Sequence, residues 1–344
     1  MRLDFYLWED EMNVYIYSEW QNLIEKSGVG RALHHQKYAA LHNQIHLVND
    51  WRDADIVHIN TVFAGSPVLA QKARHKHIPV VFHAHSTKED FRNSFIGSNQ
   101  LDRLFGKWIM YCYNQGDVII TPSQYSKLLL RSYGIKKPIA VLSNGIDTGF
   151  FAREKVDPSW FRKKYGYGQD TKIIMGVGLP IARKGILDFI ELAGRMPQYQ
   201  FIWFGDINRN MLPAKIRRKI QSAMPNVRFA GYVDPAELRQ AYGSCDLFLF
   251  PSYEETEGIV VLEALSMKIP VMVRDIPVYL DWLQDGKNVY KAKNLEEFQV
   301  KAGQILEREL PELTDAGYQV AKDRDLKAIG KQLQNIYRKC LENV

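Results

Sequence analysis

Cysteine is scarce in this chain of 344 residues, which contains only three. Cys112, Cys245 and Cys340 lie far apart and form no CxxC pair, which excludes a disulfide-stapled scaffold and a cysteine-rich zinc site. Isolated thiols of this kind are typical of buried, reduced cysteines, so we expect a cytoplasmic protein.

Long hydrophobic runs are absent as well. No stretch offers the roughly 18 uncharged apolar residues that a membrane-spanning helix needs. The N-terminus, MRLDFYLWEDEMNVY, carries acidic residues directly behind a short apolar segment. The sequence therefore predicts neither a membrane span nor a signal peptide.

Neither the net charge nor the histidine content identifies one class of binding partner. The net charge of +6 is compatible with nucleic acid, an anionic lipid or a phosphorylated small molecule. All nine histidines lie between His34 and His85, but no pair has a zinc spacing with cysteine partners. Most of them are expected at the surface or as hydrogen-bonded core residues.

What the sequence does contain is an alternation of short apolar runs and longer amphipathic segments. Segments such as 123–134 and 234–244 begin with serine or aspartate and end near a glycine, as helices do. Runs rich in β-branched and aromatic residues predict strands covered on both faces, at 2–8, 54–60, 79–85, 117–123, 138–144, 172–178, 199–205, 227–232, 246–252 and 269–275. The predicted fold class is therefore α/β, with two doubly wound parallel sheets in two domains.

In such sheets ligands bind at the carboxyl ends of strands, and four motifs lie at such positions. The first, Gly28-Val29-Gly30, opens a segment that looks helical. Glycines at a helix start let backbone N–H groups approach an anion closely. An ordinary helix entry is the alternative, because no GxGxxG fingerprint is completed.

The second and third motifs carry cations and histidines. In GVGLPIARKG, Arg183 and Lys184 precede a predicted helix, where two fixed cations can neutralise a diphosphate without a metal. A solvated helix start is the alternative. In PVVFHAH, strand alternation points His83 and His85 to the same side, either into a site or into the core.

The fourth motif is PSYEETEGIVVLEAL, in which Glu255 and Glu263 flank Gly258 and an apolar run. The run after Gly258 predicts a buried helix. Burying an unpaired carboxylate is costly, so each glutamate needs hydrogen-bond donors. Sugar and ribose hydroxyls can supply them, and a structural salt bridge would also satisfy Glu263.

Together these motifs resemble the retaining glycosyltransferases of family 4. The GVG loop, the strand-end histidine, TPSQYSKLLL followed by LSNGID, the ARKG turn and the E-x7-E pattern ETEGIVVLE occur in the family's order over nearly the whole chain. The resemblance implies the GT-B fold, with Rossmann-like domains at residues 1–149 and 150–325 that face each other across a cleft. It also implies that the last helix, at 326–344, returns to the first domain.

The resemblance implies roles for individual residues. The expected catalytic residues are Glu255, His85, Arg183 and Lys184: Glu255 binds donor-sugar hydroxyls, and the cationic pair stabilises the leaving phosphate. Glu263 is the expected clamp on the nucleotide ribose. The other expected donor-binding residues are Gly28, Val29, Gly30, Gly178, Tyr232, Glu257, Gly258, Ile259 and Val260, of which the last three would hold the diphosphate with their backbone amides.

The chain departs from the family pattern at two positions. The family usually has an arginine after the glycine that corresponds to Gly178, and its absence here leaves Arg183 with more of the phosphate charge. Glu257 replaces a phenylalanine before the helix glycine. A third carboxylate so close to the sugar would tune the choice of donor.

The implied reaction needs no metal and no cofactor, only the UDP-sugar donor. Arg183, Lys184 and the helix amides supply a positive field that stabilises charge on the departing phosphate. Asp53-Ala54-Asp55 mimics the DxD motif of metal-dependent GT-A enzymes, but it precedes a predicted strand instead of ending one.

HSTKEDF and EETEGIVVLEAL are most similar to bacterial enzymes that glycosylate diacylglycerol lipids. The similarity implies transfer of galactose or glucose from a UDP-sugar to monoglucosyl-diacylglycerol, with no nucleic-acid partner. A soluble or polyprenyl-linked acceptor, such as a cell-surface polysaccharide, is one alternative. A non-catalytic nucleotide-sugar-binding protein is another.

A lipid acceptor implies peripheral binding to the inner face of the cell membrane. Residues 100–112 repeat apolar residues along one helical stripe, at Leu101, Leu104, Phe105, Trp108, Ile109 and Cys112. Aromatic and apolar residues beside cations suit an anionic membrane surface. The expected contacts are Lys72, Arg74, Lys76, Arg103, Lys107 and Trp108, and packing of the stripe on its own sheet is the alternative.

Overall fold

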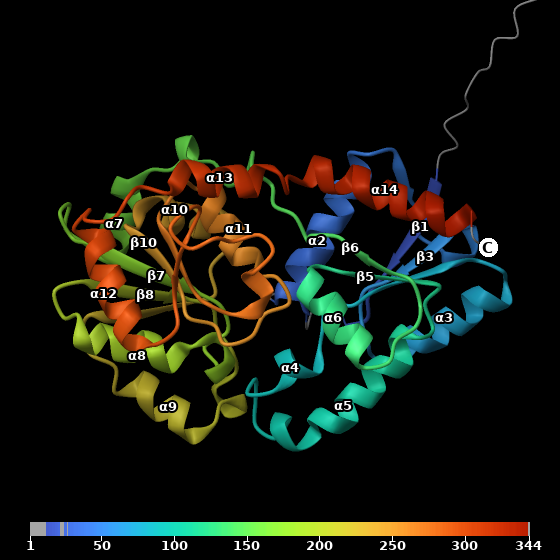
Figure 1. The fold of residues 1–344 in the computed structure, drawn as a ribbon, viewed down its shortest axis with the longest axis horizontal. Helices are drawn as coiled ribbons and strands as arrows, with labels where there is room; N and C mark the ends of the chain where they lie inside the picture. The colour runs from blue at the N-terminus through green and yellow to red at the C-terminus, as the bar shows by residue number, and fades with distance from the viewer. Residues whose placement is uncertain (1–11, 21–23, 26, 343–344) are drawn as a thin grey trace, which may run out of the picture.

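The computed structural model describes residues 12–20, 24–25 and 27–342, which form two lobes side by side (Figure 1). The strand predicted at 2–8 lies outside the described residues. Each lobe holds one six-stranded sheet whose strands run parallel. This confirms the predicted fold class of two doubly wound parallel sheets.

The N-terminal sheet has the order β2-β1-β3-β4-β5-β6. Helices α2 and α14 pack on one face, and α3, α5 and α6 pack on the other. The strands are β1 (Met12–Tyr17), β2 (Ile45–Leu47), β3 (Ile56–Ile59), β4 (Val80–His83), β5 (Val118–Thr121) and β6 (Ile139–Val141). The helices are α2 (Gly28–Leu41), α3 (Gly65–His75), α4 (Lys88–Phe91), α5 (Ser98–Tyr113) and α6 (Gln124–Ser132).

The C-terminal sheet has the order β12-β11-β10-β7-β8-β9, which is the arrangement of dinucleotide-binding domains. Helices α7, α10, α11 and α13 cover one face, and α8, α9 and α12 cover the other. The strands are β7 (Ile173–Val177), β8 (Gln200–Phe204), β9 (Val227–Gly231), β10 (Leu247–Phe250), β11 (Val271–Arg274) and β12 (Tyr290–Ala292). The helices are α7 (Pro158–Tyr165), α8 (Ile186–Arg195), α9 (Ala214–Gln221), α10 (Pro235–Ser244), α11 (Ile259–Ser266), α12 (Leu295–Leu306) and α13 (Thr314–Lys322).

Local sequence accounts for most of these elements. Every residue of β3, β4, β10 and β11 is buried, which requires the continuous apolar runs that predicted them. The side chains of Ser123 and Asp234 accept hydrogen bonds from the first turns of α6 and α10, as the predicted helix starts require. Strands β1, β2 and β12 were not predicted. The prediction placed the first strand at 2–8 and not at Met12–Tyr17, and β2 and β12 have only three residues each.

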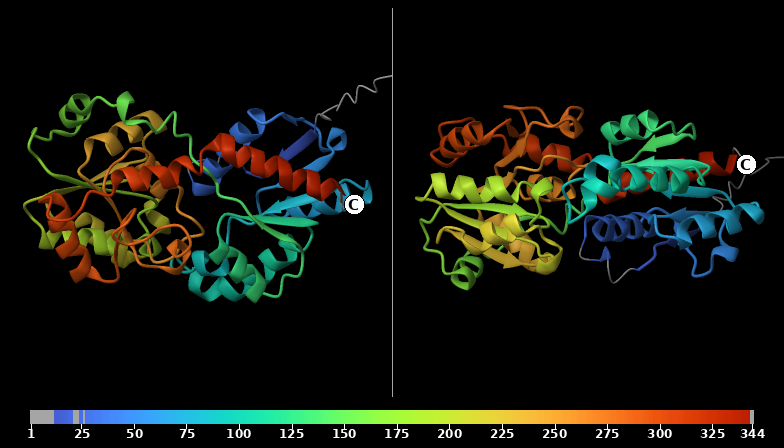
Figure 2. Two further views of the ribbon diagram at one scale, coloured as in Figure 1. Left: turned by 45° about the horizontal axis from the view of Figure 1, so that its top comes forward. Right: turned by 90° about the horizontal axis from the view of Figure 1, so that it is seen from below.

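After α13 the chain crosses from the second lobe back to the first, where the C-terminal helix α14 (Leu326–Glu342) lies (Figures 1 and 2). Leu333, Tyr337 and Cys340 are buried in the core of the N-terminal sheet, which confirms the predicted return of this helix. Near the crossing, Ile146 and Asp325 form a β-bridge between the two connecting segments. The exact domain limits, 1–149, 150–325 and 326–344, stay a prediction.

The structure also describes the cysteines and the length and hydrophobicity of the helices. All three cysteines are free and buried, which confirms the expectation of isolated, buried thiols. Within the described part of the chain, no helix is both long and apolar enough to cross a bilayer.

Candidate active site

A cavity of about 490 Å³ lies between the two lobes, and residues of both lobes line it. It brings together twelve of the predicted catalytic and donor-binding residues: His85, Arg183, Lys184, Glu255, Gly28, Val29, Gly178, Tyr232, Gly258, Ile259, Val260 and Glu263. Gly30 and Glu257 are not among the residues that line it.

Glu255 lies at the centre of a polar cluster in the loop after β10. Its Oε1 accepts hydrogen bonds from Lys184 Nζ and Ser252 Oγ, both at 2.6 Å, and lies 3.9 Å from Arg183 Nη1. Glu255 is 6% exposed, so these partners replace the water that a buried carboxylate would lose. Together Glu255, Lys184 and Arg183 carry a net positive charge, which suits an anionic ligand.

The neighbouring cations decide the protonation state of Glu255. Burial by itself raises the pKa of this carboxyl, but the Lys184 ammonium and the Arg183 guanidinium outweigh burial and hold the pKa below its usual value. Glu255 is therefore ionised at neutral pH. Burial lowers the pKa of Lys184, and Glu255 opposes that shift.

The turn that carries the two cations depends on close backbone packing. Residues Ala182–Lys184 form a 3₁₀ turn that ends at Gly185. Gly185 has a φ of +74°, and a Cβ at this position would lie 2.2 Å from the carbonyl oxygen of Pro251. Only glycine allows the turn to lie against the end of β10, and this contact brings Lys184 to Glu255.

Helix α11 begins at the wall of the cavity. Its N-cap residue Gly258 has a φ of +97°, and no described side chain caps the helix. A helix start leaves backbone N–H groups without intrahelical partners and carries the positive end of the helix dipole. Gly258, Ile259 and Val260 line the cavity, so this end of α11 is suited to a phosphate group.

Glu263 lies further along α11 and is 1% exposed. Its Oε2 accepts a hydrogen bond of 2.9 Å from the Tyr242 hydroxyl, and its Oε1 lies 3.7 Å from Arg31 Nε on α2. Burial raises the pKa of Glu263, while Arg31 and Tyr242 oppose this shift. The salt bridge that the sequence left open therefore exists, and Glu263 also lines the cavity.

His85, two residues after the end of β4, is the last of three stacked histidine rings, of which the other two lie in β3 and β4. The rings of His85 and His83 lie 4.0 Å apart, and His83 stacks on His58 at 5.3 Å, as strand alternation predicts for His83 and His85. His85 Nε2 donates to Asn60 Oδ1 at 2.9 Å. Burial lowers the pKa of His85 to about 3, so this ring is neutral at physiological pH.

Gly30 and Glu257 do not line the cavity, but both take part in the packing of the structure around it. A Cβ on Gly30 would lie 2.3 Å from the carbonyl oxygen of Ile24, so the glycine permits close backbone packing. Glu257 Oε2 accepts hydrogen bonds from the backbone N and Nδ2 of Asn144, at 2.9 and 2.7 Å. A role of Glu257 in donor choice stays a prediction and would act through this contact with the other lobe.

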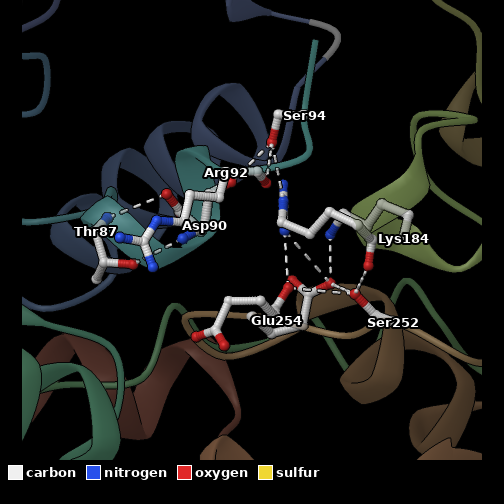
Figure 3. A network of polar contacts seen from close by, with 9 residues as sticks. Thr87, Asp90, Arg92, Ser94, Lys184, Ser252 and Glu254 are labelled. Carbon is white, nitrogen blue, oxygen red and sulfur yellow. Dashed lines mark hydrogen bonds and ion pairs between the residues drawn. The ribbon is translucent and has the colours of Figure 1, made fainter. Parts of the chain in front are cut away.

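Sequence analysis missed several polar residues that meet the cluster from the N-terminal lobe. Figure 3 shows Thr87, Asp90, Arg92 and Ser94 opposite Lys184, Ser252 and Glu254. Arg183 Nε donates to Ser94 Oγ at 3.1 Å, and the backbone N of Arg183 donates to Asn93 O at 3.3 Å. Asp90 lies within HSTKEDF, the segment already singled out, whereas Ser94 has no distinguishing pattern of its own.

The predicted membrane-contact residues lie outside the cavity, on α3, directly after it and on α5. Each of Lys72, Arg74, Lys76, Arg103, Lys107 and Trp108 is exposed. The predicted stripe on α5 divides between two faces: Ile109 and Cys112 are fully buried, whereas Leu101 and Leu104 are 50% and 67% exposed. Packing on the sheet thus accounts for part of the stripe, and the rest faces outward.

The DxD-like triplet Asp53-Ala54-Asp55 takes part in local backbone structure. Asp53 ends a 3₁₀ turn, and Asp55 Oδ2 accepts a hydrogen bond of 2.8 Å from the backbone N of Asn13. Neither residue lines the cavity. Over the residues that the structure describes, no group of three or more histidine, cysteine, aspartate or glutamate side chains is arranged to hold a metal ion.

Comparison with known proteins adds family and fold information. Residues 11–150 match the family described as Glycosyltransferase Family 4, and residues 160–323 match the one described as Glycosyl transferases group 1. The chain is 40% identical over 333 residues to the processive diacylglycerol alpha-glucosyltransferase of Acholeplasma laidlawii, covering 96% of this chain and 99% of that protein.

Two further proteins are similar to this chain, one over a shorter segment and the other at lower sequence identity. Over 121 residues the chain is 36% identical to the alpha-galactosylglucosyldiacylglycerol synthase of Streptococcus pneumoniae, covering 34% of this chain and 32% of that protein. The crystal structure of Anabaena Alr3699/HepE in complex with UDP-glucose superposes with a TM-score of 0.77 at 16% identity, over 97% of this chain and 100% of that one. This structural similarity establishes the same fold.

Proposed function

The chain belongs to glycosyltransferase family 4, and we propose that it transfers glucose from UDP-glucose to a diacylglycerol-based lipid. It is a retaining hexosyltransferase with the GT-B fold. The full-length similarity to a processive diacylglycerol alpha-glucosyltransferase is the observation that carries the choice of acceptor. The acceptor is monoglucosyl-diacylglycerol, and a processive enzyme would also start from diacylglycerol itself.

The cavity supports a mechanism that depends on fixed charges. The donor diphosphate binds at Arg183, Lys184 and the N-terminus of α11, and Glu263 binds the nucleotide ribose. Glu255 holds hydroxyls of the transferred sugar. As the bond between the sugar and the diphosphate breaks, the cations and amides stabilise the charge that develops on the phosphate. The acceptor hydroxyl attacks the sugar from the same face and passes its proton to the departing phosphate oxygen.

Protonation states fit this division of roles. An ionised Glu255 accepts hydrogen bonds from sugar hydroxyls, and a neutral His85 can form hydrogen bonds without adding charge beside a developing oxocarbenium ion. The positive field is supplied by side chains and backbone that are already in place. Activity should therefore persist in EDTA.

Galactose is the alternative donor sugar, because part of the chain is similar to an alpha-galactosylglucosyldiacylglycerol synthase. The proposed site of action is the inner surface of the cell membrane. The exposed cations and apolar residues of α3 and α5 support this location, since they combine charge and apolar surface on one part of the molecule.

The test is to incubate the purified protein with UDP-glucose or UDP-galactose and with diacylglycerol or monoglucosyl-diacylglycerol, with and without EDTA. Mass and linkage analysis should identify an α-linked glucosyl product. Lys184→Ala should lower kcat by about 100-fold or more, as loss of one preorganised charge contact does.

Lys215→Ala is the matched control, because Lys215 is an exposed lysine outside the cavity. Its turnover should equal that of the wild type. Wild-type turnover in Lys184→Ala would contradict the assigned site, and a product only with water-soluble or polyprenyl-linked acceptors would contradict the lipid acceptor.

A further inference from the structure

One wall of the cavity makes none of the proposed contacts to the donor. It is formed by α4 and by the segment that leads into α5, in the N-terminal lobe. Asp90, Phe91, Phe95 and Phe105 line the cavity there. These residues lie opposite the cluster of Glu255 and Lys184, so they are placed on the side from which a second substrate would approach.

One oxygen of the Asp90 carboxylate is held by a hydrogen bond at the start of α4, and the other oxygen is available to a ligand. Its Oδ1 accepts a hydrogen bond of 3.2 Å from the backbone N of Thr87, and its own backbone N donates to Thr87 Oγ1. This reciprocal capping box fixes the side chain at the cavity. Among the described residues, no hydrogen bond reaches Oδ2.

The charge of Asp90 fits a position inside the cavity. The residue is half-buried, and Figure 3 shows it on the opposite side of the cluster from Lys184. Burial raises the pKa of Asp90 to about 6, while Arg183 opposes this shift. Above that pH the carboxylate can accept a strong hydrogen bond from a neutral hydroxyl.

Beside Asp90 the wall is aromatic. The rings of Phe91 and Phe105 stack with centroids 4.0 Å apart, and Phe95 meets Phe91 edge-on at 5.0 Å. The result is a continuous apolar surface next to a single carboxylate. On the same helix as Phe105, the side chains of Leu101 and Leu104 face outward, so the apolar surface continues toward the exterior of the protein.

We propose that this wall is the acceptor subsite, in which Asp90 Oδ2 accepts a hydrogen bond from a sugar hydroxyl of the acceptor while Phe91, Phe95 and Phe105 contact its apolar diacylglycerol portion. A polar point next to an aromatic surface matches a glycolipid, which joins a sugar to an apolar body. The inference rests on the proposed function, and it assigns residues that the donor contacts leave unused.

The test is the variant Asp90→Asn, assayed with UDP-glucose and with monoglucosyl-diacylglycerol in detergent micelles. Asparagine keeps a carbonyl oxygen for the Thr87 cap, so the fold of α4 is retained. The value of kcat/KM for the lipid should fall about 10- to 100-fold, as expected for loss of a hydrogen bond to a charged group. The Kd for UDP-glucose, measured by calorimetry, should stay unchanged.

The matched control is Glu89→Gln on the same helix. The carboxylate of Glu89 accepts a hydrogen bond from Tyr133, and Glu89 does not line the cavity, so kcat/KM for the lipid should remain near the wild-type value. A second variant, Phe95→Ala, should lower kcat/KM for the lipid several-fold, again without a change in the Kd for UDP-glucose.

The outcomes separate this inference from the proposed function. If the wild type glycosylates the lipid but Asp90→Asn has wild-type kcat/KM, the subsite is wrong and the proposed function stands. If Asp90→Asn weakens UDP-glucose binding by the same factor, Asp90 belongs to the donor site and the inference is overturned. If the wild type glycosylates no diacylglycerol lipid, both fail, and the wild-type reaction alone reveals it.

Discussion

At the scale of single residues, the buried histidines connect the site to the stability of the N-terminal lobe. Burial lowers the pKa of His58 to about 3 and that of His83 well below its usual value. His58 hydrogen-bonds to the Tyr337 hydroxyl at 2.6 Å. Neither ring nitrogen of His83 has a hydrogen-bond partner in the described structure, so a proton on His83 would be buried without compensation.

The variant His83→Phe tests this cost. Because the folded pKa lies below the unfolded value of 6.5, the unfolded chain binds more protons in acid. The stability that neutral His83 contributes is therefore complete above pH 6.5 and is lost as the pH falls. Between pH 7 and pH 5 the free energy of unfolding should fall by about 2 kcal/mol less in His83→Phe than in the wild type.

Urea unfolding at the two pH values measures this difference. The same substitution at His46, which is exposed, should leave the pH dependence of the wild type unchanged. An equal loss of stability in His83→Phe and in the wild type would show that protonation of His83 does not oppose folding.

At the scale of elements, the turn at Ala182–Lys184 determines whether the cations reach the cavity. The turn is held against the end of β10 by the contact of Gly185 with Pro251. Ser252 lies between the two segments, since its Oγ donates to Glu255 Oε1 at 2.6 Å and lies 3.2 Å from Arg183 O. A shift of this turn would move Arg183 and Lys184 together.

The variant Gly185→Ala should displace the turn. A left-handed backbone costs a residue with a Cβ about 1–2 kcal/mol, and the overlap with Pro251 should add about 1–3 kcal/mol. We expect this loss in the free energy of unfolding by urea, together with weaker binding of UDP-glucose.

Gly166→Ala is the matched control, because Gly166 has a φ of +73° and nothing within 4 Å of the added Cβ. Gly166→Ala should lower the free energy of unfolding only by the cost of the left-handed backbone, and it should bind UDP-glucose as the wild type does. Equal effects of the two substitutions on stability and binding would rule out a positioning role for the packed turn.

At the scale of the whole molecule, the two lobes and one outer surface define how substrates can reach the cavity. The proposed donor-binding residues come mainly from the C-terminal lobe, and the aromatic wall comes from the N-terminal lobe. Helices α3 and α5 are joined by a hydrogen bond of 3.1 Å between Gln71 and Tyr111. Their exposed cations and apolar side chains thus lie on connected elements, on the lobe that supplies the proposed acceptor wall.

This surface should bind vesicles that contain anionic lipid, and binding should weaken as salt screens the charges. Substituting Arg103 and Lys107 together by alanine should weaken binding about 30-fold, since each cation near an anionic surface contributes roughly 1 kcal/mol. Co-sedimentation with phosphatidylglycerol vesicles measures the effect.

The matched control replaces Lys327 and Lys331, which have the same spacing and are exposed on α14, along the opposite edge of the molecule in Figure 1. Vesicle binding should stay at the wild-type level. Salt-independent binding, or none by the wild type, would instead favour a soluble acceptor.

Features that depend on local backbone geometry could be predicted from the sequence alone. Continuous apolar runs predicted the buried strands, and serine or aspartate predicted the helix starts. Alternation along β4 predicted that His83 and His85 share a side. The motifs that carry Lys184, Glu255 and Glu263 were predicted at the carboxyl ends of parallel strands, which meet at the same edge of a sheet. The family resemblance then implied that these residues belong to one site.

Which side chains meet across the two lobes could not be predicted from the sequence, because it depends on how the folded lobes are arranged. The contacts of Arg31 with Glu263, Ser94 with Arg183 and Asn144 with Glu257 join residues that lie between 89 and 232 positions apart in the sequence. The apolar stripe on α5 divides into a buried and an exposed part because only one face of the helix packs on the sheet of its own lobe. Such contacts depend on how whole lobes pack, whereas sequence periodicity reports only the geometry of one strand or helix at a time.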